Sequence, residues 1–345
     1  MPTTYAIPDG RTVMAATTYT GTGASLAVSN AVNSVSFQPD FVWIKDRSNA
    51  RNNSLLNSIT GTSNILFSDL TNAEQTGTPY LTSFNSNGFT AGPTYANVNG
   101  SGETYVGWQW KAGGTAVSNT SGSITSSVSA NTTAGFSVVT YTGTGSSGAT
   151  VGHGLGVVPS MIIVKVRSTT NNWSVYHSSL GNAQTVYLNL TQAASSGSTT
   201  SWNSTTPTSS VFTIGPDGAV NASGATFVAY CFAAVAGYSA FGSYTGNGSA
   251  DGPFVYTGFR PRFVLIKRTD TTGAWCVYDT SRNTYNTADL ELNPNSSAAE
   301  NSGNAFDILS NGFKCRDAFG AHNASGGTYV YACFAENPLK YANAR

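Results

Sequence analysis

One pattern recurs three times in the sequence, as Pro39-Asp-Phe-Val-Trp-Ile-Lys45, Pro159-Ser-Met-Ile-Ile-Val-Lys165 and Pro261-Arg-Phe-Val-Leu-Ile-Lys267. Each copy places consecutive apolar residues between a proline and a lysine, so both faces of an extended chain would be apolar. Such a strand must be covered on both sides. Proline suits the first position of a strand because its missing N–H costs nothing there. The pattern therefore predicts three buried strands.

Two further signals accompany each of these segments. A tyrosine–glycine turn precedes it, as Tyr19-Thr-Gly-Thr-Gly23, Tyr141-Thr-Gly-Thr-Gly145 and Tyr244-Thr-Gly-Asn-Gly248. An aromatic strand follows it, as Thr104-Tyr-Val-Gly-Trp-Gln-Trp110, Thr226-Phe-Val-Ala-Tyr-Cys-Phe232 and Thr328-Tyr-Val-Tyr-Ala-Cys-Phe334. The proline lies 66 residues before the first aromatic residue of that strand in copy one, and 68 before it in the other two. Matches in register at fixed spacing indicate an internal repeat.

The repeat defines the expected domain organisation. We predict copy one over residues 17–113, copy two over 114–236 with a leading linker and strand, and copy three over 237–337. An N-terminal arm over residues 1–16 and a C-terminal tail over 338–345 flank them. Each copy is large enough to bury a core of its own.

Local signals favour strands and turns. Thr, Ser, Asn, Gly and Val dominate, and all are mediocre or poor helix formers. Asn87-Gly88 and Asn311-Gly312 predict type I′ hairpins, and Asp217-Gly218 predicts a similar turn in copy two. The best helix candidate is Thr71-Asn-Ala-Glu-Gln75. We predict an all-β protein of three tandem β-sandwich domains, of jelly-roll or lectin-like type.

The composition narrows the range of partners. Only 9% of the 345 residues are charged, against a typical ~25%, and the formal net charge is zero. A basic surface for nucleic acid is therefore not expected. The first residues lack the basic and apolar regions of a secretory signal, and no run approaches ~18 apolar residues, so membrane insertion is not expected. At 40% hydrophobic and 12% aromatic residues, the chain is too apolar for disorder.

Cofactor and metal motifs are weak. Gly143-Thr-Gly-Ser-Ser-Gly148 matches the dinucleotide-binding pattern, but Val151-Gly-His-Gly-Leu-Gly156 follows where a helix is required. The histidines and cysteines lack the spacing of zinc sites. They are His153, His177, His322, Cys231, Cys276, Cys315 and Cys333. We expect a turn histidine at 153, four unpaired thiols, no metal and no cofactor.

Catalytic signatures are also missing from the sequence pattern. No GxSxG elbow accompanies the many serines. A glycoside hydrolase needs two neighbouring carboxylates, and Asp279 is a candidate acid in copy three where copy two has His177. Because no such group repeats, we expect no catalytic residue and a protein that is not an enzyme.

Four aromatic residues have two alternative interpretations. Trp173-Ser-Val-Tyr176 and Trp275-Cys-Val-Tyr278 begin eight residues after their strand lysines, where copy one has Asn53. Their rings would either stack on sugars or pack within the sheets, and packing is favoured. Receptor-binding residues stay unassigned.

The quoted segments resemble those of bacteriophage virion proteins, especially from phages of marine and cyanobacterial hosts. The resemblance covers nearly the whole chain. It is carried by Gly154-Leu-Gly-Val-Val-Pro-Ser-Met-Ile-Ile-Val-Lys165, Phe37-Gln-Pro-Asp-Phe-Val-Trp-Ile-Lys45 and Phe334-Ala-Glu-Asn-Pro-Leu-Lys-Tyr-Ala-Asn-Ala-Arg345. These motifs mark strands and turns, so they transfer no catalytic residue.

The resemblance implies a tail-fibre or tail-tip component that recognises the host. The alternatives are an architectural part, such as a capsid decoration, head fibre or tail adaptor, and a polysaccharide depolymerase. The expected partners are other virion proteins, further copies of the chain in a homo-oligomer, as a trimer above all, and a host-surface glycan. The expected location is the surface of a particle assembled in the host cytoplasm, with the arm over residues 1–16 as its attachment element.

Overall fold

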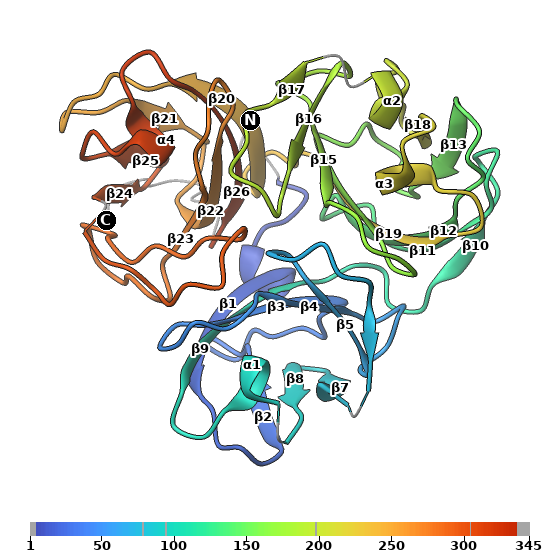
Figure 1. Ribbon diagram of the computed structural model, residues 1–345. Coiled ribbons are helices and arrows are strands. Elements are labelled where there is room, and N and C mark those ends of the chain that lie inside the picture. Colours follow the sequence, from blue (N-terminus) through green and yellow to red (C-terminus); the bar gives the residue numbers. More distant parts are fainter. Residues whose placement is uncertain (1–4, 78, 94, 197–198, 304, 337–345) are drawn as a thin grey trace.

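The computed structural model describes residues 5–336, apart from 78, 94, 197, 198 and 304. The expected tail over 338–345 and the first four residues of the expected arm lie outside this part. Strands make up 42% of the chain and helices 6%, which confirms the all-β class. The chain forms three lobes around a common junction, and each lobe contains one copy of the repeat (Figure 1).

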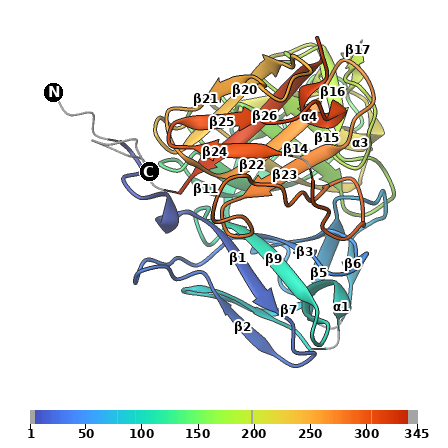
Figure 2. The same ribbon diagram turned by 90° about the vertical axis from the view of Figure 1, so that its left-hand side faces the viewer.

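Copy one, the lower lobe in Figure 1, contains a large and a small antiparallel sheet. The large sheet has the order β1 (Met14–Thr20), β9 (Thr104–Trp110), β3 (Phe41–Asp46), β4 (Ser54–Asn57), β5 (Asn64–Phe67) and β6 (Gln75–Thr76). The small sheet has the order β2 (Leu26–Ser29), β8 (Gly88–Ala91) and β7 (Leu81–Asn85). Figure 2 shows β1 and β9 side by side, beneath the lobes of the other copies.

Copy two repeats this order with two extra edge strands. Its large sheet runs β10 (Val117–Asn119), β11 (Ser126–Asn131), β12 (Phe136–Thr142), β19 (Thr226–Phe232), β14 (Met161–Val166), β15 (Ser174–His177), β16 (Gln184–Tyr187) and β17 (Ser195–Ser196). Its small sheet pairs β13 (Ala149–Gly152) with β18 (Val211–Ile214). The edge strands β10 and β11 come from the leading segment expected for this copy.

Copy three keeps four strands of the large sheet, the counterparts of β1, β9, β3 and β4. That sheet runs β20 (Ser239–Thr245), β26 (Thr328–Ala335), β22 (Pro261–Arg268) and β23 (Trp275–Asp279). The small sheet runs β21 (Phe254–Tyr256), β25 (Gly312–Cys315) and β24 (Phe306–Leu309). The helices are single turns: η1 (Gly10–Thr12), α1 (Ala96–Asn99), α2 (Thr199–Trp202), α3 (Gly218–Asn221) and α4 (Gly320–Asn323). None of the helices in the described residues is long and apolar enough to span a membrane.

The proline-led strands are covered on both faces, as their sequence predicts. All six residues of β3 are buried. Phe41 and Trp43 enter a core shared by the three copies, whereas Val42 and Ile44 enter the core between the two sheets of copy one. The continuous apolar pattern therefore reflects two separate cores, one on each side of the strand.

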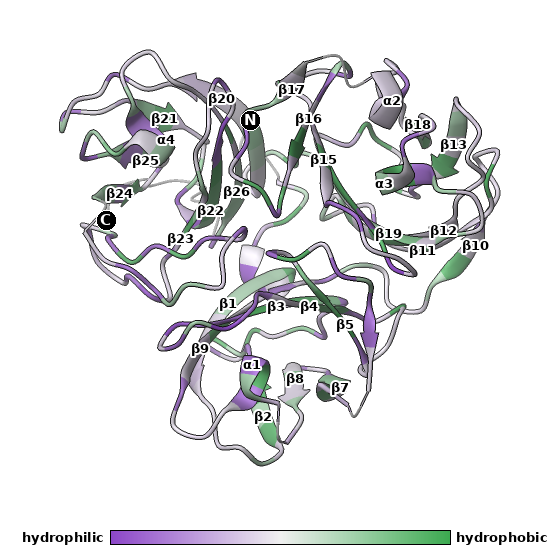
Figure 3. Cartoon of the chain, viewed as in Figure 1, coloured by the Kyte–Doolittle hydropathy of each residue, from purple (hydrophilic) through white to green (hydrophobic). Residues whose placement is uncertain are grey.

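The shared core closes the junction between the lobes. Each copy contributes the same three positions, two from its proline-led strand and one from its closing strand. These residues are Phe41, Trp43 and Trp110; Met161, Ile163 and Phe232; and Phe263, Leu265 and Phe334. They leave a small cavity of about 10 Å³ between them, lined by these nine apolar side chains. Figure 3 shows hydrophobic colour along the strands that meet here.

The strand lysines join neighbouring copies in a cycle. Their side chains are buried, and each Nζ donates to a backbone carbonyl of another copy. Lys165 reaches Thr71 at 2.8 Å, Lys267 reaches Thr191 at 3.0 Å and Lys45 reaches Ser297 at 3.2 Å. Copy two thus binds copy one, copy three binds copy two, and copy one binds copy three.

Backbone hydrogen bonds and ion pairs follow the same cycle. The amides of Glu74, Ala194 and Glu300 donate to the carbonyls of Arg167, Thr269 and Arg47, at 2.7, 2.9 and 2.9 Å. Two of these pairs add ion pairs, Arg167–Glu74 at 2.6 Å and Arg47–Glu300 at 2.8 Å. Because every copy contacts both others, the three lobes form one closed ring.

A third cyclic contact contains the histidine of copy two. Asn57 Nδ2 donates to Tyr230 Oη at 3.2 Å, and His177 Nε2 donates to the Tyr331 carbonyl at 3.1 Å. The corresponding Asp279 accepts from Trp108 Nε1 at 3.0 Å. These three side chains occupy one repeated position, twelve residues after the strand lysine, and each is used to join two copies.

His177 is expected to make the ring sensitive to acid. Burial lowers the pKa of His177 to about 4, so between pH 6.5 and 4 the unfolded chain binds a proton that the folded chain does not. Stability is then present above pH 6.5 and is lost as the pH falls, by about 3 kcal/mol at full effect. His177→Asn installs the residue of copy one and should flatten this part of the profile, measured as melting temperature against pH. An equal acid loss in both proteins would contradict the assignment.

Several local predictions need correction. Thr71–Gln75 is not helical, because the Thr71 carbonyl accepts from Lys165 and Glu74 binds Arg167, which holds the segment extended against copy two. The boundary expected at residue 16 falls inside β1. Ile7, Val13 and Met14 enter the shared core, so the described part of the expected arm belongs to the ring.

The predicted hairpins form, with a different turn. Asn85 pairs with Gly88 and Leu309 with Gly312, so the loops are Ser86-Asn87 and Ser310-Asn311. None of these loop residues is among the described residues with positive φ, so type I′ geometry was wrong. A Cβ at Gly88 or Gly312 would collide with a carbonyl of the neighbouring strand, which explains the glycines. Asp217 does not form a hairpin but caps α3, accepting from the Ala219 amide at 2.9 Å.

Candidate functional site

The residues singled out in the sequence mostly hold the ring together. The indoles of Trp173 and Trp275 are buried and donate to the carbonyls of Phe67 and Tyr187 in the preceding copy, both at 2.9 Å. Tyr176 and Tyr278 are buried as well. Packing is therefore confirmed for these four aromatic rings, and a sugar platform built from them is ruled out.

Asp279 is a structural acid. It is fully buried, and its carboxylate binds Arg282 Nε at 2.6 Å in addition to Trp108. Burial acts to raise the pKa of Asp279, but the Arg282 guanidinium outweighs burial and holds that pKa below its usual value. A carboxylate enclosed in this way is not available to a substrate.

The glycine-rich loop and His153 also have structural roles. β13 follows the loop in place of the helix that a dinucleotide site requires. His153 is buried, its Nε2 donates to the Thr208 carbonyl at 3.1 Å and its Nδ1 accepts from the Leu155 amide at 3.2 Å. It is a turn histidine, as expected.

A repeated asparagine explains the tyrosine–glycine turns and was missed in the sequence. Asn99, Asn221 and Asn323 are fully buried, each five residues before its closing strand. Each side-chain oxygen accepts from the backbone amide between the two glycines of its turn, at 2.8, 2.8 and 2.9 Å. The equal spacing of these three asparagines was the available signal.

The clearest surface site is a cavity of about 660 Å³ in copy three. Two other surface cavities measure about 340 Å³ each. The lining residues of the large cavity are Arg260, Thr280, Thr284, Tyr285, Asn286, Ile308, Leu309, Ser310, Asn311 and Glu336. Hydroxyl, amide and charged groups share this lining with an apolar surface of similar extent, which suits a ligand that has both polar groups and apolar faces.

Three elements build this cavity. The Ser310-Asn311 hairpin loop forms one wall. A second wall is the segment after β23, which is four residues longer than in the other copies and carries Tyr285, whose side chain is 85% exposed. Asn286 fixes that segment by exchanging two hydrogen bonds of 2.9 Å with the Ile308 backbone. The Arg260–Glu336 ion pair, at 2.9 Å, completes the rim.

A cluster of three polar side chains lies inside the same lobe. The side chains of Cys276, Glu291 and His322 are buried, and one potential ligand atom from each lies within 4.8 Å of the others. These residues are 15 and 31 positions apart in the chain, so no spacing rule detects them. The sequence prediction of no metal relied on the spacing of histidines and cysteines along the chain, and that spacing does not reveal this group.

Comparison with known proteins identifies one family. Residues 10–338 match the profile described as a domain of unknown function (DUF7483). No curated protein and no solved structure matches the chain. The matched range contains all three copies, and therefore the surface cavity of copy three and its Cys276, Glu291 and His322 cluster. The chain belongs to the DUF7483 family, whose function is not defined.

Proposed function

We propose that this chain is a structural protein of a bacteriophage virion, displayed on the particle for recognition of the host surface, and that the cavity of copy three is its receptor site. The observation that carries the receptor role is that one wall of this cavity is a segment four residues longer than its counterparts in the other two copies. The other two copies contribute to ring closure without these four residues, so the longer segment indicates a role other than closure.

The proposed ligand is a hydroxyl-rich host glycan. Tyr285 offers an exposed aromatic ring for stacking, and the hydroxyl and amide groups around it can hydrogen-bond to sugar oxygens. Arg260 and Glu336, which form an ion pair at the rim, add a donor and an acceptor for sugar hydroxyls. Copy two has Val158 at the position of Arg260, so it lacks the guanidinium of copy three at this position.

The lobes themselves support the display role. We assign each two-sheet unit to the β-sandwich type, jelly-roll or lectin-like, that virion proteins use. With few charges on the chain, the exposed loops present mainly Ser, Thr, Asn and Gly, which suit adaptable polar recognition. The expected homotrimer stays a prediction, and the ring already provides a threefold arrangement within one chain.

An architectural role is the second candidate. The observation that favours it is the shared core, which joins the three lobes into one body instead of three independent domains. A capsid decoration, head fibre or tail adaptor would use such a body as a spacer. The depolymerase alternative is weaker, because the acid singled out for it, Asp279, is buried and ion-paired.

The receptor role is tested with purified protein and host cells. We expect the wild-type chain to block phage adsorption and to bind envelope polysaccharide, since Tyr285 and Arg260 lie in its binding cavity. Tyr285→Ala and Arg260→Ala should weaken binding about tenfold each. Val158→Ala, at the position in copy two that matches Arg260, is the control and should bind as the wild type.

Two results would contradict the receptor site. If the folded chain neither binds polysaccharide nor blocks adsorption, the recognition role fails and the architectural role takes its place. If it binds but Val158→Ala weakens binding as much as Arg260→Ala, the site lies elsewhere. A decoration protein would instead be present in head-only particles, at a copy number set by capsid symmetry.

A further inference from the structure

The interior of copy three contains a set of polar groups that do not contribute to ring closure. Cys276 lies on β23, Glu291 lies in the segment that pairs with β23 beside Val277, and His322 lies on α4. The three are 0%, 2% and 0% exposed. Thiol, carboxylate and imidazole groups thus meet in the space between the two sheets of this lobe.

Hydrogen bonds orient the histidine and the carboxylate of this set toward each other. His322 Nε2 donates to Asp317 Oδ1 at 2.8 Å, so its Nδ1 faces the cluster. Asn293 Nδ2 donates to Glu291 Oε1 at 2.9 Å, and Oε2 accepts from Tyr278 Oη at 2.5 Å. The same hydroxyl lies 3.1 Å from His322 Nδ1. A carboxylate behind the outer nitrogen of a histidine is the arrangement that fixes metal-ligating histidines in proteins.

The other two copies show that the fold does not require these groups. The cross-strand pair Val277–Leu292 corresponds to Leu55–Leu66 in copy one and to Val175–Val186 in copy two. Glu291 precedes Leu292, so its counterparts are Ile65 and Thr185. At the other two positions, Cys276 replaces Ser54 and Ser174, and His322 replaces Val98 and Val220. Copies one and two therefore build the same interior without a Cys/Glu/His set.

We propose that Cys276, Glu291 and His322 bind one divalent transition-metal ion of the zinc type inside copy three, with Tyr278 beside it. Thiolate, carboxylate and imidazole together are a zinc ligand set. On binding, the Cys276 thiol forms the metal–sulfur bond and releases its proton to solvent. Because the position is enclosed, we expect the ion to be bound as the lobe folds.

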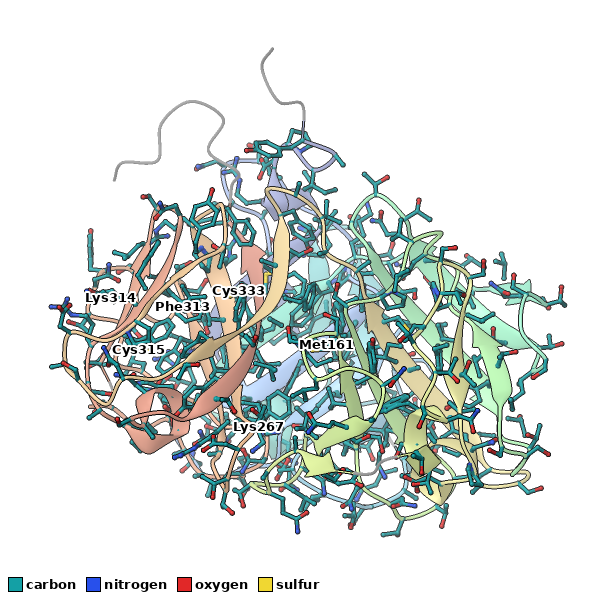
Figure 4. The ribbon with its side chains drawn as sticks, turned by 90° about the horizontal axis from the view of Figure 1, so that it is seen from above. Met161, Lys267, Phe313, Lys314, Cys315 and Cys333 are labelled. Atoms are coloured by element: carbon teal, nitrogen blue, oxygen red, sulfur yellow. The ribbon has the colours of Figure 1, made fainter. Side chains whose placement is uncertain are left out.

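Metal binding has to overcome the environment of the cysteine thiol. Burial and the neighbouring Glu291 carboxylate raise the pKa of the Cys276 thiol well above its usual value. A divalent cation offsets both effects by pairing with the thiolate and the carboxylate. On the other side of the cluster, Cys315 on β25 donates to the His322 carbonyl at 3.5 Å. Figure 4 shows Cys315 and Phe313 within this lobe and Lys314 at its outer edge.

The test measures metal in the whole protein. Protein purified from zinc-supplemented cells, without a histidine tag, should contain about one zinc per chain by mass spectrometry. Protein from cobalt-supplemented cells should show a thiolate-to-cobalt charge-transfer band. Competition with a chelator should give a lower affinity for Cys276→Ser, which installs the residue of both other copies, and the loss should exceed the ~10–100-fold typical of outer-shell substitutions. Cys333→Ser changes a buried thiol of the same copy outside the cluster and should retain the metal.

Each remaining outcome decides against the site. Wild-type protein with less than about a tenth of an equivalent of either metal, and the same melting temperature before and after chelation, would overturn it. So would equal metal affinity in wild type and Cys276→Ser in the chelator competition, because the ion would then be bound elsewhere. Melting temperature also separates a loss of metal from a loss of folding in either variant.

Discussion

Replacing Trp110 with alanine is expected to lower the free energy of unfolding of the whole ring by about 3–5 kcal/mol. Trp110 is 2% exposed and lies in the junction, where its ring contacts aromatic rings from all three copies. Its centroid lies 5.4 Å from those of Phe41 and Phe263 and 6.2 Å from that of Phe232. Removing the indole opens a cavity that the three lobes share, so the loss should affect them together.

Urea unfolding followed by circular dichroism measures this effect. Wild type should unfold in one transition, because no lobe can leave the junction without exposing the core of the others. Trp110→Phe is the matched control, since the other copies have Phe232 and Phe334 at this position, and it should lose less than half as much. A cost below about 1 kcal/mol for Trp110→Ala, or separate transitions for the lobes in the wild type, would contradict a shared core.

Replacing Arg282 with methionine is expected to cost about 3–5 kcal/mol, because it leaves a buried acid without its cation. Arg282 and Asp279 are both fully enclosed and joined at 2.6 Å. Arg282 also binds Glu300 at 3.0 Å, and Glu300 binds Arg47 of copy one. The substitution therefore breaks an ion-pair network that links copies three and one.

The companion variant tests the cause of that loss. Copy one has Asn57 at the position of Asp279, so Asp279→Asn combined with Arg282→Met removes both charges and keeps a polar group. The double variant should be more stable than Arg282→Met alone, measured by the same urea titration. If the two substitutions add without recovery, the loss comes from the packing of Arg282 and not from an unpaired carboxylate.

The strands could be predicted from the sequence, and their association could not. The apolar run from Phe41 to Ile44 predicts a strand that is covered on both sides. It does not predict that one of these sides packs against another copy. The Thr71 segment was misread as a helix because its extended form depends on Lys165, which is 94 residues away. Contacts of this kind depend on the ring as a whole and leave no local trace.

The two sites of copy three were not predicted from the sequence, for different reasons. The longer segment with Tyr285 shows up only when the copies are aligned through their sheet register. Cys276, Glu291 and His322 come from three separate elements, and their meeting depends on the pairing of Leu292 with Val277. The asparagine that holds each tyrosine–glycine turn was detectable in principle, since Asn99 and its two counterparts have equal spacing.

The most direct test of the virion assignment is to locate the protein in purified phage particles. Mass spectrometry should detect the chain in particles freed of host protein, and electron cryo-microscopy should show three-lobed density of one chain on the particle surface. Labelling with antibody against the folded ring should mark the tail for a recognition protein and the head for a decoration protein. A chain found free in the host cytosol and absent from particles would contradict the assignment.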